Sequence, residues 1–185
     1  MTLVKTKIDT EKDLNCHSLE SDLTDNKFIS AADDYLNKHL KQVLINKSLH
    51  YSSNGKFGVH ELIAWTLRQT GTANLLVSSF SISTDAVRLM ILLKKKSLIN
   101  QAVFIFDTKT KSNNAKSIKI LIEHFPVHFI NIHAKIFLIY NENIKIAHTG
   151  SGNLTNNPRI ETGIFFPQKE IFDFYFKLLN DATNH

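Results

Sequence analysis

Apolar residues recur every three or four positions in five segments of this 185-residue chain, a period that predicts α-helices. The segments are 30–46, 59–69, 83–96, 116–125 and 169–179. Ser30 is placed to cap the first, and a Ser/Thr cap precedes the apolar part of the third. Gly71 follows the second and is expected to end it.

Shorter apolar runs between and after these helices have the length and composition of strands. They are 73–80, 101–107, 127–130, 135–140, 143–150 and 160–166, whereas 51–58 is predicted to be a loop. The turn-forming sequence 141–143 suggests that 135–140 and 143–150 form a hairpin. Strands that alternate with helices and then give way to a β-rich end predict an α/β fold, with a mixed β-sheet flanked by helices.

Charge divides the chain into two parts. Residues 1–50 carry 7 Lys/Arg and 8 Asp/Glu, a net −1, and are predicted to be an acidic, helical N-terminal arm. Residues 51–185 carry 15 against 9, a net +6, and are predicted to be the catalytic domain. A basic field attracts anionic partners such as nucleic acids, although a solvated basic face is the simpler interpretation of charge alone.

Other features limit the possible classes of protein. The longest apolar runs are too short to cross a bilayer, and the first residues lack the apolar stretch of a signal peptide. The single cysteine, Cys16, fits a reducing compartment. We therefore expect a cytoplasmic protein without stable membrane association. His124 and His128 lack nearby acidic or cysteine ligands, so no metal site is expected.

Candidate chemistry gathers at the ends of the predicted hairpin. Alternate residues of a strand share a face, so His133 and Lys135 lie side by side where the first strand begins. The second strand leads into a glycine-rich turn that contains Gly150, Ser151, Gly152 and Asn153. Strand pairing would bring the two ends together. Histidine is a nucleophile or a general acid and base, and lysine, serine and asparagine are donors to a developing oxyanion, a set that suits attack on phosphorus.

The pattern His133-x-Lys135 followed by Gly150-Ser151-x-Asn153 resembles the signature of the phospholipase D superfamily. Glu161 falls where family members carry an acid that supports the catalytic histidine. The resemblance covers roughly residues 57–166, is to single-motif members, and implies a phospholipase D-like domain that needs no cofactor.

The candidate residues divide into two groups. The resemblance implies that His133, Lys135, Ser151, Asn153 and Glu161 are catalytic. Gly150, Gly152 and Arg159 are candidates for contact with the substrate. Simpler interpretations remain for several of them. Ser151 and Asn153 are common turn residues, and Glu161 could instead form a surface ion pair with Arg159 or Lys145. His148, on a face with Ile144 and Ile146, is predicted to be a packed histidine.

One position departs from the family pattern. The motif usually continues H-x-K-x4-D, and here Tyr140 occupies the aspartate position. An odd number of steps separates it from Lys135, so its side chain is expected to face away from the motif. The departure leaves two hypotheses, an active enzyme and a degenerate module that binds nucleic acid without cleaving it.

The resemblance implies a two-step displacement on a phosphodiester through a phosphohistidine. The mechanism needs two motifs and this sequence contains one, so we expect a homodimer with the site at its interface. The predicted function is that of a metal-independent phosphodiesterase, an endonuclease-like hydrolase that acts on DNA or RNA. A phospholipid substrate is the other enzymatic alternative.

Overall fold

The computed structural model describes residues 31–42, 47–156 and 158–184. Ser30, Cys16 and the stripe positions Val43 and Leu44 lie outside these residues. Within the described residues the helices are α1 (Ala31–His39), α2 (Val59–Thr70), α3 (Thr84–Lys95), α4 (Thr110–Asn113), α5 (Ala115–Ile122) and α6 (Lys169–Thr183). The strands are β1 (Leu49–Ser52), β2 (Ala73–Ser79), β3 (Ile99–Asp107), β4 (Val127–Ile130), β5 (Ile136–Tyr140), β6 (Lys145–Gly150) and β7 (Thr162–Phe166).

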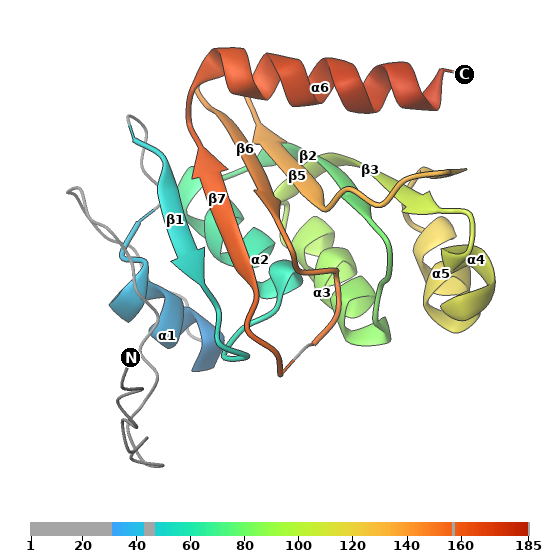
Figure 1. Ribbon diagram of the computed structural model, residues 1–185, viewed down its shortest axis with the longest axis horizontal. Coiled ribbons are helices and arrows are strands. Elements are labelled where there is room, and N and C mark those ends of the chain that lie inside the picture. Colours follow the sequence, from blue (N-terminus) through green and yellow to red (C-terminus); the bar gives the residue numbers. More distant parts are fainter. Residues whose placement is uncertain (1–30, 43–46, 157, 185) are drawn as a thin grey trace, which may run out of the picture.

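The described strands form one mixed sheet in the order β1-β7-β6-β5-β2-β3-β4 (Figure 1). Strands β2, β3 and β4 are parallel, and every other neighbouring pair is antiparallel. The parallel part comes from the alternating strands and helices of the first half, and the antiparallel part from the β-rich end. The predicted mixed α/β sheet and the predicted β5–β6 hairpin are both confirmed.

Helices cover both faces of the sheet. Apolar residues of α1, α2, α3 and α5 pack on one face in a core that includes Trp65, Phe104 and Phe137. Helix α6 lies across the other face, where Phe172 and Leu179 are buried in a second, smaller core. Figure 1 shows α6 running along the side of the sheet away from α2 and α3. Because both faces are covered, the central strands read as nearly continuous apolar runs.

Several boundaries differ from the sequence-based expectations. Tyr51 and Ser52 belong to strand β1, which pairs with β7, so the predicted loop 51–58 begins too early. A strand of this length shows no clear pattern in the sequence, and only its pairing with β7 identifies it. The short helix α4 was not predicted. Helix α1 ends at His39 instead of continuing to residue 46, because Lys41 adopts a positive φ of 59° and its N–H returns to the Leu36 carbonyl.

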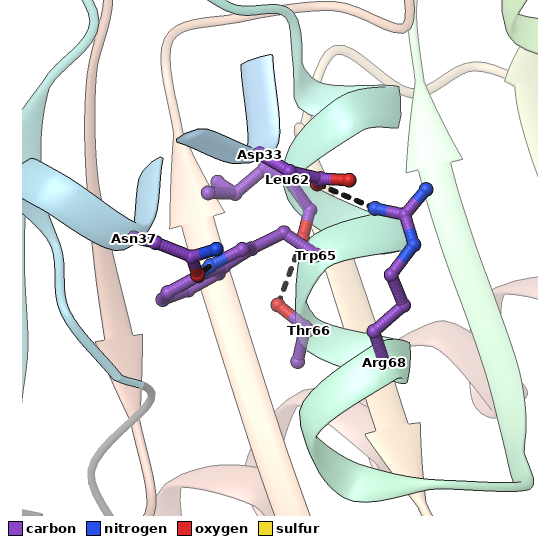
Figure 2. Close-up of polar contacts among 6 residues, drawn as sticks. All are labelled: Asp33, Asn37, Leu62, Trp65, Thr66 and Arg68. Atoms are coloured by element: carbon purple, nitrogen blue, oxygen red, sulfur yellow. Dashed lines mark hydrogen bonds and ion pairs between the residues drawn. The ribbon is translucent and has the colours of Figure 1, made fainter. Parts of the chain in front are cut away.

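The described part of the predicted N-terminal arm packs on the domain. Leu36 of α1 is buried in the main core. Figure 2 shows two polar contacts that fix α1 against α2. The indole N–H of Trp65 donates to Asn37 Oδ1 at 2.8 Å, and the Arg68 guanidinium lies 2.5 Å from the Asp33 carboxylate. The division at residue 50 stays a prediction.

We expect Asp33→Ala to lower the free energy of unfolding by about 2 kcal/mol, because it leaves the partly buried guanidinium of Arg68 without this carboxylate. Denaturant titration followed by circular dichroism measures the change. Asp34→Ala removes the same charge from an exposed position on the same turn and is the matched control. Equal effects of the two substitutions would contradict a specific role for the Asp33 contact.

Candidate active site

Strand direction brings four chain segments to one edge of the sheet. Strands β2 and β6 end at this edge, and β5 and β7, which run antiparallel to their neighbours, begin there. The four strands are consecutive in the order β7-β6-β5-β2. The segment before β5 carries His133 and Lys135, and the segment after β6 carries the glycine-rich turn. Glu161 precedes β7, and the end of β2 adds residues that the motif does not contain.

His133 and Lys135 lie directly before β5, which begins at Ile136, and not within the strand as predicted. They are nevertheless side by side. The Lys135 ammonium donates to the His133 carbonyl at 2.7 Å, and it lies 3.2 Å from Nδ1 and 3.4 Å from Nε2 of the imidazole. The ammonium is thus almost equally distant from the two ring nitrogens.

The face assignment of the strand is confirmed. Phe137 and Ile139 point into the main core, whereas Ile136 and Leu138 point toward α6. Tyr140 shares the α6 side, and its ring centroid lies 5.5 Å from those of Phe172 and Phe176. Burial there raises the pKa of the Tyr140 hydroxyl. The residue that departs from the family pattern is therefore a packing residue on the far face of the sheet.

The glycine-rich turn is joined to the segment before β5 and to the segment before β7. The Gly150 N–H donates to the Lys135 carbonyl at 3.2 Å. The Ser151 hydroxyl donates to the Glu161 carboxylate and accepts from the Thr162 N–H at 3.0 Å. A Cβ on Gly150 would lie 2.6 Å from the Thr162 carbonyl oxygen, a separation that real side chains do not tolerate. Glycine is required here so that the two segments can approach.

Gly152 is required for a second close approach. A Cβ at this position would lie 2.8 Å from Cγ2 of Val59, at the start of α2. The turn is packed against α2 as well as between the strands. Gly152, Asn153 and Glu161 also line a small pocket whose other walls include Ser53 and Phe57.

Asn153 is oriented by the end of β2. Its Oδ1 accepts from the Phe80 N–H at 3.1 Å and from the Ser79 hydroxyl at 3.2 Å. Because Oδ1 accepts these two hydrogen bonds, the orientation of the amide is fixed. Its Nδ2 group has no acceptor among the residues that the structure describes, so it can donate to a ligand. An oriented amide donor is what stabilisation of an anion requires.

Phe80 is the contact residue that sequence reasoning missed. Its ring centroid lies 5.0 Å from that of the His133 imidazole and 5.8 Å from the Lys135 ammonium. Its backbone N–H holds Asn153. One residue thus touches three of the four motif side chains from the neighbouring strand. The sequence marks this residue only as the last position of a predicted strand. An apolar side chain at such a position does not by itself indicate a functional site.

Partial burial and a nearby acid shift the pKa of Lys135 in opposite directions. Burial lowers the pKa of its ammonium, and the negative charge of Glu161 opposes that shift. Glu161 is therefore linked to Ser151 by a hydrogen bond and to Lys135 by its field. Arg159 is exposed two residues earlier, and its predicted contact with substrate stays a prediction. Within the described ranges, no group of three or more His, Cys, Asp or Glu side chains is arranged to bind a metal ion.

His148 is a packed histidine, as predicted. It is buried, stacks on Phe137 with ring centroids 4.2 Å apart, and lies 2.8 Å through Nε2 from the Tyr51 hydroxyl. Burial lowers the pKa of its imidazole to about 3. The Tyr51–His148 pair leaves no room for a side chain at Gly163, where a Cβ would lie 2.5 Å from the tyrosine hydroxyl. The pair supports the strands that carry the site and is not part of the site.

The fold is similar to that of a known phosphoryl-transfer protein. No family model matches the chain, and no curated protein matches it. Among solved structures it is similar to polyphosphate kinase from Porphyromonas gingivalis, with a TM-score of 0.54 and 14% sequence identity. The match covers 80% of this chain and 29% of that one, so the chain spans less than a third of that protein's length.

This similarity defines the fold. At 14% identity it concerns the fold alone. The predicted α/β fold, a mixed sheet flanked by helices, is the fold observed. Among the described helices, none has the length and apolar character needed to span a membrane.

We expect the free energy of unfolding to fall as the pH is lowered below 6.5. Buried His148 has a folded-state pKa of about 3 against 6.5 when exposed, so between these values protons bind preferentially to the unfolded chain. The contribution is at most roughly 1.4 kcal/mol per pH unit. Denaturant titrations between pH 7.5 and 5 should show a smaller slope for His148→Gln, while the exposed His124→Gln should keep the wild-type slope. Identical slopes for both variants would contradict a neutral, buried His148.

Proposed function

We propose that the protein is a metal-independent phosphodiesterase, a nuclease that cleaves DNA or RNA through a phosphohistidine intermediate at a homodimer interface. The observation that carries the proposal is the convergence of His133, Lys135, Asn153 and the Ser151–Glu161 pair at one edge of a phospholipase D-like sheet. This arrangement provides a nucleophile, a cation and an oriented amide donor without a cluster of metal ligands.

The first step forms a bond between an imidazole nitrogen of His133 and phosphorus, while the bond from phosphorus to the leaving oxygen breaks. The partner subunit's His133 gives its proton to the leaving oxygen. That second histidine then removes a proton from water, the water oxygen attacks phosphorus, and the P–N bond breaks to release the product. Lys135 and Asn153 stabilise the negative charge on the non-bridging oxygens in both steps.

Each residue has a positional role that supports this sequence of steps. The Lys135 ammonium lies 3.2 Å from Nδ1 and 3.4 Å from Nε2 of the His133 imidazole, so a phosphate attacked by this ring would lie within reach of the lysine. Phe80 packs against the His133 ring and limits its rotation. Glu161 holds Ser151, and through it the glycine-rich turn, next to the start of β7.

The chain supplies one motif, and the mechanism uses two histidines. A twofold axis close to His133 would bring two copies of the same residue to one phosphate. Nucleic acid is the favoured substrate because residues 51–185 carry a net charge of +6. The second candidate is a module that binds nucleic acid without cleaving it, which is favoured by Tyr140 in the usual aspartate position. A phospholipid substrate is the third.

We expect the protein to cleave plasmid or oligonucleotide in the presence of EDTA, and His133→Ala to lower the rate by roughly 10³-fold or more, because the nucleophile is lost. Gel electrophoresis of the products measures the rate. His124→Ala, which removes an exposed histidine after α5, is the matched control. Binding without cleavage would support the binding module, and hydrolysis restricted to phospholipid would contradict both nucleic-acid proposals.

We expect mixed subunits to reveal a shared site. If wild-type and His133→Ala chains exchange freely, activity should fall with the square of the wild-type fraction, because a mixed dimer contains only one histidine. The total protein concentration is kept constant, and sedimentation gives the oligomeric state. A linear dependence on the wild-type fraction, or a strict monomer that retains activity, would contradict the shared site.

A further inference from the structure

The segment from Thr108 to Ile122 is strongly basic. It contains Lys109, Lys111, Lys116 and Lys119 and no aspartate or glutamate. All four lysines are exposed, and none forms an ion pair with a carboxylate among the residues that the structure describes. The exposed Lys169 and Lys177 and the half-buried Lys145 do pair with acids. Within the described residues this segment thus forms no ion pair, and acids lie only at its two ends, Asp107, which accepts from the Lys109 N–H at 2.9 Å, and Glu123.

The segment is fastened to the loop that contacts the candidate catalytic histidine. The buried Thr110 hydroxyl donates to the Phe80 carbonyl at 2.6 Å. Asn114 Oδ1 accepts from the Ser81 hydroxyl at 3.1 Å. Phe80 is the residue whose ring packs on His133. Lys109 and Lys111 flank Thr110 in the sequence, so their backbone positions are fixed relative to the site by this hydrogen bond.

Topology places the segment at the same edge of the sheet as the candidate active site. It follows the carboxyl end of β3, which is parallel to β2, and β2 lies next to β5. Figure 1 shows α4 and α5 side by side beside the β4 end of the sheet. Helix α5 begins at this edge, has no acid in its first turn, and carries Lys116 there instead. The dipole of the helix adds to the positive field of the lysines.

We propose that Lys109, Lys111 and Lys116 form a lysine track that binds the sugar–phosphate backbone of a nucleic acid where it leaves the active site. The inference rests on the proposed nuclease function and adds the direction of the bound strand, from His133 across the ends of β2 and β3 toward α5. Lysines bind phosphates as point charges without reading sequence. The lysine track contributes to the affinity for the nucleic acid and to its position along the surface. The residues around His133 carry out the cleavage.

The chain contains an internal control for this surface. Lys94, Lys95 and Lys96 are equal in number and also exposed, but they end α3, whose first residues lie at the active-site edge. They therefore lie at the opposite edge of the sheet. Lys94 is further engaged with the His124 carbonyl at 2.7 Å and with the Phe125 ring. Neutralising these three removes the same charge without touching the track.

The test compares Lys109→Gln/Lys111→Gln/Lys116→Gln with Lys94→Gln/Lys95→Gln/Lys96→Gln, each in the His133→Ala background. Fluorescence anisotropy with a labelled single-stranded oligonucleotide gives the affinity between 50 mM and 300 mM salt. The track variant should bind roughly 10- to 100-fold more weakly near 0.1 M salt, with a salt slope smaller by about 2, from about 0.7 for each lost phosphate contact. The control variant should stay within about threefold of its parent. Thermal unfolding of both variants checks that they fold.

Equal weakening by the two triple variants would overturn the track, because it would show a non-specific effect of net charge. Cleavage measurements with active His133 separate this failure from failure of the proposed function. If the wild-type protein cleaves nucleic acid and both triple variants bind alike, only the track is wrong. If the wild-type protein cleaves no nucleic acid, the nuclease proposal fails, and the binding comparison still decides whether the track holds a polyanion.

Discussion

The antiparallel pairing of β5 with β2 is the interaction on which the rest of the structure depends. Ile136 pairs with Ser78 and Tyr140 with Asn74, so β5 begins where β2 ends. Had β5 been parallel to β2, as β3 is, His133 would lie at the far edge of the sheet, away from Phe80. The reversal brings the motif histidine next to the end of a strand that precedes it by more than fifty residues.

The antiparallel pairing of β6 and β7 brings further residues to the same edge of the sheet. Strand β6 returns antiparallel to β5 and delivers the glycine-rich turn to the edge where β5 began. Strand β7 then starts from that edge and leaves Glu161 beside Ser151. The Tyr51–His148 pair fills the space over Gly163, where a Cβ would lie 2.5 Å from the tyrosine hydroxyl. The site is thus built from segments at the ends of strands, and the rigid sheet fixes their positions. Catalytic groups need such rigid support to keep their geometry.

Much of this could be predicted from the sequence, because the helices have a clear apolar period and the central strands are short, nearly continuous apolar runs. The hairpin followed from the turn-forming sequence 141–143, and the face of Tyr140 and the packed state of His148 followed from parity along single strands. Strand β1 and helix α4 were missed, since Tyr51 and Ser52 form a strand only through β7, and four residues hold too few turns for a period to show. Phe80 was missed for a related reason. Its contacts are made across strands, and a single sequence does not record which strand lies next to β5.

The position of Tyr140 bears on whether the site is complete. Tyr140 pairs with Asn74 and Lys145, at the opposite end of β5 from the motif. Five steps along the strand separate it from Lys135, a rise of about 17 Å. Its ring packs on α6, whereas Phe137, on the other parity, faces the main core. A side chain in this place does not contact the reacting groups. It can affect them only by changing the position of strand β5. Its aromatic contacts with Phe172 and Phe176 hold that strand, so the departure from the motif lies in the packing of β5 on α6 and not among the groups around His133.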